Sequence, residues 1–219
     1  MSNQSLNLTI HSDHSVVEIN GIKRTMDTAE AINAITGYLN IGKVESLESF
    51  RLPRNTTTFA HGPRTAKLQV YFPQCRRDVT HTGLKDKLNI AVPNIIIVFD
   101  LNKSNTQSTW GVGNAVYFCT SREIGAIEER FVSAKDKDIW VLPFPNIFSS
   151  GKPCYGGNSM PTGFIENDLR GLLWYYEFLF SSPFNNDLSI PSISTGDSPT
   201  KWLNRLAKAE AFPYDLLSR

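Results

Sequence analysis

The sequence has no long hydrophobic run and no excess of charge of either sign. Its longest apolar stretch, residues 94–99, is far shorter than the roughly 20 residues that a membrane-spanning helix needs. Residues 1–13 have neither the basic start nor the apolar centre of a signal peptide. Lysine and arginine number 22, aspartate and glutamate 21, and no basic cluster stands out. This balance argues against binding to nucleic acid or to a membrane.

Cysteine is scarce as well. Cys75, Cys119 and Cys154 are odd in number and have no paired spacing, which is typical of a reducing cytoplasm rather than of a disulfide framework. Together with the four histidines, they lack the close Cys-x-x-Cys or His-x3–5-His pairs that mark a zinc site. We therefore expect a cytoplasmic protein that uses no metal and no cofactor.

What the sequence does contain is a series of strand patterns. Three segments have the apolar alternation or the β-branched and aromatic content of strands: 66–73, 89–101 and 114–122. Pro93 interrupts the second segment, so its strong part is 95–99. Ahead of them, weaker patterns predict a strand over 14–21 and a helix over 27–39.

Helix patterns follow the strands. Prolines and glycines over 143–163 exclude a regular element there. Two helices are predicted after this irregular loop: 166–180 and 198–212. Asn167 or Asp168 would cap the first, and Ser198 the second, with Pro199 in its first turn.

This order predicts an α+β fold in which C-terminal helices pack on an antiparallel sheet. At 219 residues, the chain is long enough to bury its core in one large domain or two small ones. We assign residues 1–60 to an N-terminal extension of strand and helix character, packed on a main domain of residues 61–219.

Cys154 stands in an unusual context. A free cysteine is usually buried, but this one lies in "PFPNIFSSGKPCYGG", residues 143–157, among turn-forming residues that favour the surface. Such a cysteine is placed to meet another molecule.

The same stretch resembles the ubiquitin-conjugating enzymes, in which a His-Pro-Asn motif follows a strand meander and the catalytic cysteine follows the Asn by eight positions. Here Asn146 and Cys154 have that spacing, and Phe144 replaces the histidine. The stretch is more closely similar to the bacterial conjugating-enzyme-like family that includes PRTRC system protein B. "VPNIIIVFD" and the aromatic "WYYEFLFSSPF" support this resemblance, which extends over about 66–190. The histidine that family members tend to carry after the cysteine is also missing: "SSPFNND" has Asn185 and Asn186 there.

The resemblance implies a UBC-like fold and a role in conjugation. Cys154 would carry a ubiquitin-like modifier as a thioester, received from an activating enzyme and passed to an amine or a partner. A deubiquitinase-like metalloprotein is a further implied partner. Asn146 would donate a hydrogen bond to the oxyanion or hold the loop by bonding to backbone atoms. Four residues are assigned to binding of the modifier: Gly151, Gly156, Gly157 and Asn185.

Other interpretations of the same residues remain open. Asn146 could be an ordinary turn residue, and Cys154 an inert thiol. The missing histidines leave open a catalytically inactive variant that binds a modifier or serves as an assembly subunit. A cysteine hydrolase would pair Cys154 with His61 or His81. Of the other cysteines, Cys119 is expected in the core, and Cys75 has no expected function.

Overall fold

The computed structural model describes most of the chain after residue 50 and three strands before it. The ranges described are 6–10, 15–19, 22–26, 50–104, 109–123, 130–156, 160, 163–165 and 168–218. The predicted helix over 27–39 lies outside them. In the described part, no helix is long and apolar enough to cross a membrane.

The strands in these ranges are β1 (Leu6–Ile10), β2 (Ser15–Ile19), β3 (Ile22–Met26), β4 (Thr56–His61), β5 (Thr65–Phe72), β6 (Cys75–Val79), β7 (Leu88–Val92), β8 (Asn94–Lys103), β9 (Thr109–Thr120), β10 (Ile139–Val141) and β11 (Gly163–Ile165). The helices are the 3-10 helix η2 (Arg170–Leu173), α2 (Trp174–Ser181), α3 (Pro199–Lys208) and the 3-10 helix η3 (Tyr214–Leu216).

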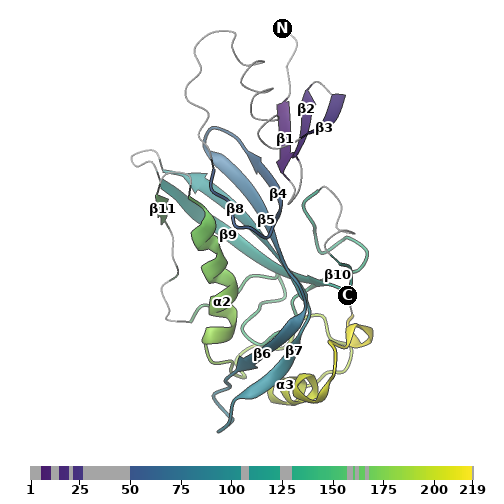
Figure 1. Ribbon diagram of the computed structural model, residues 1–219. Helices are drawn as coiled ribbons and strands as arrows, with labels where there is room; N and C mark the ends of the chain where they lie inside the picture. Colours follow the sequence, from purple (N-terminus) through teal and green to yellow (C-terminus); the bar gives the residue numbers. More distant parts are fainter. Residues whose placement is uncertain are drawn as a thin grey trace.

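A six-stranded antiparallel sheet forms the centre of the protein, with the order β10-β9-β8-β5-β4 and β11 paired to β9 (Figure 1). Its middle strands β5, β8 and β9 are the three that the sequence predicted, and C-terminal helices follow them. The α+β prediction is therefore confirmed, and the arrangement is compatible with a UBC-like fold.

Pro93 divides the predicted strand over 89–101 into two strands that belong to different sheets. β7 ends at Val92 and pairs with β6 in a separate hairpin, whereas β8 starts at Asn94 and pairs with β5 and β9. Proline has no backbone N–H to donate to a ladder, so pairing changes at this residue. The β6–β7 hairpin is thus an insertion between β5 and β8, which are neighbours in the central sheet.

The N-terminal part contributes a second sheet, in the order β1-β2-β3. β2 corresponds to the strand predicted over 14–21. β1 contacts β4, whose residues 56–61 pair with β5. The boundary that we expected at residue 60 falls inside β4, so the central sheet begins before it.

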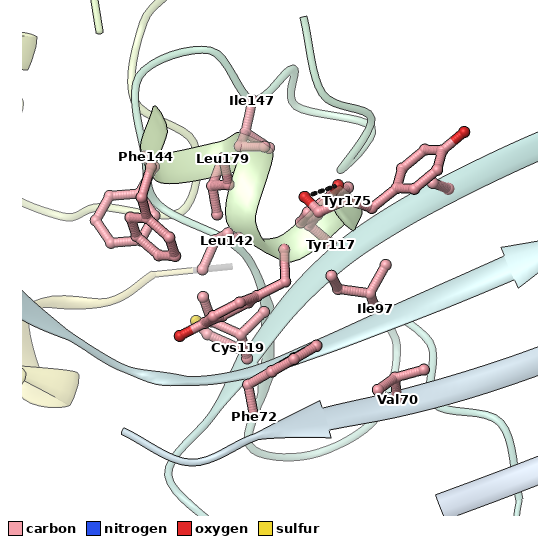
Figure 2. Close-up of a cluster of buried hydrophobic side chains, with 14 of the residues drawn as sticks. Val70, Phe72, Ile97, Tyr117, Cys119, Leu142, Phe144, Ile147, Tyr175 and Leu179 are labelled. Carbon is pink, nitrogen blue, oxygen red and sulfur yellow. Dashed lines mark hydrogen bonds between the residues drawn. The ribbon is translucent and has the colours of Figure 1, made fainter. Parts of the chain in front are cut away.

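The two faces of the sheet are covered differently. α2 crosses one face, where alternate residues of β5, β8 and β9 join buried side chains of α2 and of the loop after β10 (Figures 1 and 2). The close-up shows members of this cluster: Val70, Phe72, Ile97, Tyr117, Cys119, Leu142, Phe144, Ile147, Tyr175 and Leu179. The opposite face holds a smaller cluster around Ile96 and Phe118, against which Phe131 packs.

Our prediction of where the first helix after the irregular loop begins was wrong. We expected it to begin near Asp168, but the chain forms the short helix η2 before α2 begins at Trp174. Asp168 instead forms a bridge with Arg51 and accepts hydrogen bonds from the side chain and the backbone N–H of Arg170. The other proposed cap, Asn167, lies outside the described residues.

The second predicted helix is confirmed, although it ends at Lys208 rather than at residue 212. Ser198 caps α3: its Oγ accepts a hydrogen bond from the backbone N–H of Lys201 at 3.4 Å. At the other end, the Arg76 guanidinium donates to the carbonyls of Ala207 and Ala209. The helix is thereby fastened to the β6–β7 hairpin.

Replacing Ser198 by alanine should remove the capping bond and lower the free energy of unfolding by about 0.5–1 kcal/mol, the lower part of the usual range because the bond is long. Urea denaturation measures the change. Ser189→Ala is the matched control, since Ser189 is exposed and makes no hydrogen bond to the described residues. Equal stability of the two variants would contradict a capping role.

Candidate functional site

The loop after β10 is attached to β9 through the backbone of a single residue, Tyr117. The backbone N–H of Tyr117 donates to the carbonyl of Gly151 at 2.8 Å, and its carbonyl accepts from the backbone N–H of Leu142 at 3.1 Å. The indole N–H of Trp202 in α3 donates to the carbonyl of Pro143 at 2.8 Å. Strand β9 and helix α3 thus fix the loop from two sides.

Within this loop, Asn146 and Cys154 face each other across a narrow hairpin. The backbone N–H of Cys154 donates to the carbonyl of Asn146 at 2.6 Å, and Ile147 forms an antiparallel bridge with Pro153. The backbone N–H of Phe148 then donates to the carbonyl of Lys152 at 2.9 Å. A ladder with this register explains the spacing of eight residues, because it brings the first and the last residue together.

Asn146 is held in a backbone conformation that few residue types adopt. Its φ of +66° lies in the left-handed region, which asparagine tolerates better than most other residues. The side-chain Nδ2 donates to the carbonyl of Pro183 at 3.3 Å, in the segment after α2. Asn146 therefore connects the hairpin to that segment through a backbone carbonyl.

Phe144 occupies the position of the histidine in the ubiquitin-conjugating motif. Its side chain is completely buried, with the ring stacked on Phe184 at a centroid distance of 5.8 Å and edge-on to Phe180 at 6.0 Å. An imidazole here would bury polar nitrogens among aromatic rings. This position contributes to packing and supplies no proton carrier.

The Cys154 side chain is half-buried and lies against the C-terminal half of α2. It borders a hollow of about 10 Å³, close to the space for a single water molecule. The hollow is lined by Tyr117, Asn146, Pro153, Cys154, Phe178, Leu179 and Ser182. Among the described residues, the thiol has no hydrogen-bond partner, so no contact of this kind holds it in the interior.

Tyrosines next to the thiol stay protonated at neutral pH. Tyr155 packs edge-on against Tyr175 and Phe178, and burial, with the nearby Tyr175, raises the pKa of its phenol. Burial also raises the pKa of Tyr175 to about 12. The hydroxyl of Tyr117 donates to the Tyr175 carbonyl at 2.9 Å (Figure 2). These phenols fix α2 to the loop and cannot serve as bases near neutrality.

The three glycines assigned to binding differ in their surroundings. Gly151 is buried with φ +80°, and a Cβ there would lie 2.7 Å from Cγ1 of Val116. Its lack of a side chain therefore serves the chain's own contact with β9. Gly156 is exposed with φ +57° and has open space around its Cα, so a foreign backbone can approach it. Gly157 lies outside the described residues.

Asn185 and its neighbour have separate partners. The Asn185 side chain donates to Asp187 at 2.7 Å and accepts from its backbone N–H, which forms a local turn. Oδ1 of Asn186 lies 3.2 Å from Nε2 of His81. Sequence reasoning did not connect His81 with this segment, because the two are far apart along the chain and no motif joins them.

The remaining cysteines lie elsewhere. Cys119 is completely buried, as expected, and burial raises the pKa of its thiol. Cys75 is half-buried, with Sγ 3.6 Å from the hydroxyl of Tyr176. In the part of the chain that the structure describes, no three His, Cys, Asp or Glu side chains come together as a metal site requires.

The two described loop glycines give a matched test of the hairpin. Gly151→Ala should lower the free energy of unfolding by about 2–4 kcal/mol, because left-handed strain and a collision with β9 add up. Gly156→Ala has the strain without the collision, so we expect a loss of about 1 kcal/mol. Urea denaturation of both variants measures the difference. A cost for Gly156→Ala as large as that for Gly151→Ala would show that the contact with β9 is unimportant.

Comparison with protein families gives a match. The model of prokaryotic E2 family D matches residues 45–219, a range that contains the central sheet, the hairpin with Cys154 and helices α2 and α3. The match extends beyond the part in which we saw a resemblance, residues 66–190, at both ends. Neither the curated proteins nor the solved structures gave a match.

Proposed function

Because the chain belongs to prokaryotic E2 family D, we propose that it carries a ubiquitin-like modifier as a thioester on Cys154 and passes it to an amine. Membership in this family confirms the resemblance to bacterial conjugating-type proteins. It supports a conjugating role that involves a modifier and an activating enzyme. The thioester, the cysteine that bears it and the acceptor are our assignments.

The observation that carries this proposal is the pairing of Asn146 with Cys154 at the open end of an anchored hairpin. Backbone bonds to β9 hold the hairpin, so the thiol has a fixed place without being buried. A nucleophile for a protein partner needs this combination, since the tail of the partner must lie across it. Gly156 beside it leaves room for that tail.

The reaction would proceed in two acyl transfers. The Cys154 thiolate attacks the activated C-terminal carbonyl of the modifier, and the tetrahedral oxyanion collapses to a thioester as the thiolate of the activating enzyme leaves. An acceptor amine then attacks the same carbonyl and loses its proton to water. Cys154 leaves as the thiolate, and an amide bond remains.

Asn146 would stabilise the oxyanion in both transfers. Its amide nitrogen carries two hydrogens, and the bond to Pro183 uses one of them. That bond fixes the orientation of the carboxamide, while the second N–H can donate to an oxygen above the thiol. Fixed donors of this kind avoid reorganisation when charge develops.

A cysteine hydrolase finds less support. It requires an imidazole beside the thiol, but neither of the two described histidines lines the hollow at Cys154, and the two ring nitrogens of His81 are hydrogen-bonded elsewhere. His61 lies on β4 and lines a different, open hollow. His11 and His14 lie outside the described residues.

An inactive variant of the same family is the second candidate, and the buried Phe144 favours it. This function needs the surface of the segment after α2, where Asn185 is located, but not the sulfur atom. The two candidates differ in one respect: a binding subunit keeps its function in Cys154→Ala, whereas a conjugating enzyme loses it. A PRTRC-type system and a deubiquitinase-like metalloprotein stay predictions under both.

With a cognate activating enzyme, ATP and modifier, the protein should form an adduct that reductant removes. Cys154→Ser should lose this reductant-sensitive adduct, because an oxygen ester resists thiols. Cys75→Ser should keep it, since Cys75 is equally half-buried but lies outside the hairpin. Non-reducing gel electrophoresis measures both. A reductant-sensitive adduct that persists in Cys154→Ser would overturn the assignment, as would the absence of any adduct with partners of proven activity.

Asn146→Ala should slow discharge of the thioester to free lysine by about 10²–10³-fold, the usual effect of removing one oxyanion donor. The rate is followed in a single turnover on preformed thioester. Asn114→Ala is the control, because the Asn114 amide donates to Asp100 within the sheet. If Asn146→Ala discharges as fast as the unmodified chain, the carboxamide has no catalytic role.

A further inference from the structure

The segment that holds the Asn146 carboxamide is itself held from the β6–β7 connection. Next to Pro183, the backbone N–H of Phe184 donates to the carbonyl of Thr80 at 2.9 Å, and its carbonyl accepts from the N–H of Thr82 at 2.8 Å. His81 and Phe184 thus form a parallel bridge. The carbonyl that binds Asn146 is one residue from this bridge.

His81 closes the bridge with its side chain. The ring is 3% exposed, and Nδ1 accepts from the backbone N–H of Gly83 at 2.9 Å. This bond places the ring proton on Nε2, which donates to Oδ1 of Asn186 at 3.2 Å. The same oxygen accepts from the hydroxyl of Thr200 in the first turn of α3 at 3.3 Å.

We propose that His81 is a positioning residue, which holds the segment after α2 in place and thereby orients Asn146 beside Cys154. The chain of contacts is continuous: imidazole to Asn186, the bridge to Phe184, the Pro183 carbonyl, and the Asn146 amide. An effect of His81 on the rate of thioester discharge rests on the proposed function, whereas its effect on the orientation of the Asn146 carboxamide does not. The histidine missing from the sequence motif is thus replaced by one that acts at a distance, on the asparagine.

An imidazole that only stabilises the fold predicts something different. Its loss would lower stability and slow the reaction independently of Asn146. A positioning role predicts that the effects of the two residues are coupled, because one acts through the other. The test therefore combines the two substitutions.

The kinetic test is a double-mutant cycle on thioester discharge to free lysine. His81→Phe keeps a ring of similar size but removes both hydrogen bonds, and we expect about a tenfold slower discharge, part of the 10²–10³-fold typical for a donor. In the Asn146→Ala background, His81→Phe should cause no further loss. His61→Phe is the control and should leave both backgrounds unchanged. If the discharge rate of the double variant is reduced by the product of the two single effects, the residues act independently and the proposal is overturned.

A second readout needs no activity. The side-chain amide resonances of Asn146, assigned by their loss in Asn146→Ala, should shift in His81→Phe and stay in place in His61→Phe. Unmoved resonances overturn the proposal whether or not a thioester forms, and a missing thioester with shifted resonances counts against the proposed function alone. Should His81→Phe fail to fold, the exposed Asn186→Ala removes the partner of Nε2 and is expected to show the same coupling and the same shift.

Discussion

The backbone of one residue of β9, Tyr117, determines where the thiol lies. Tyr117 points its side chain into the core and uses its backbone N–H and carbonyl for Gly151 and Leu142. Both ends of the loop therefore meet at a single residue of the central sheet. Because these bonds are made by the backbone, they depend on the register of β9 and, at Gly151, on the absence of a side chain. A buried peptide left without them would be costly, which keeps the loop attached.

Much of the sheet and one helix terminus could be predicted from the sequence. Strands β5, β8 and β9 have strong local signals, since burial of one face requires alternation and burial of both faces requires a continuous apolar run such as 95–99. The cap at Ser198 is equally local: a hydroxyl and a following proline suffice. The spacing of Asn146 and Cys154, together with the preceding strands and the following aromatic segment, predicted the type of family that the comparison shows, although the structural reason for the spacing is visible only in the ladder that joins the two residues.

Features that depend on distant partners could not be predicted. β6 has the polar sequence "CRRDV" and is a strand because β7 pairs with it. Asp168 looks like a helix cap, but Arg51 and Arg170 engage it instead, and the helix starts later. The position of His81 could not be predicted from the sequence around it, because it depends on a bridge to Phe184. Five strands, β7 to β11, separate the two residues along the chain. Local patterns record propensity, and these contacts arise from tertiary structure.

The tip of the hairpin with Cys154 is exposed, whereas the loop on either side of it is held by hydrogen bonds to β9. Phe148 is 43% exposed and stands at the turn, while the bonds that hold the loop are made by main-chain atoms on either side. Side chains at this tip are therefore free to be exchanged during evolution while the sulfur keeps its position. Point substitutions at the rim can in this way change the surface around the thiol while the hairpin that holds it is inherited intact.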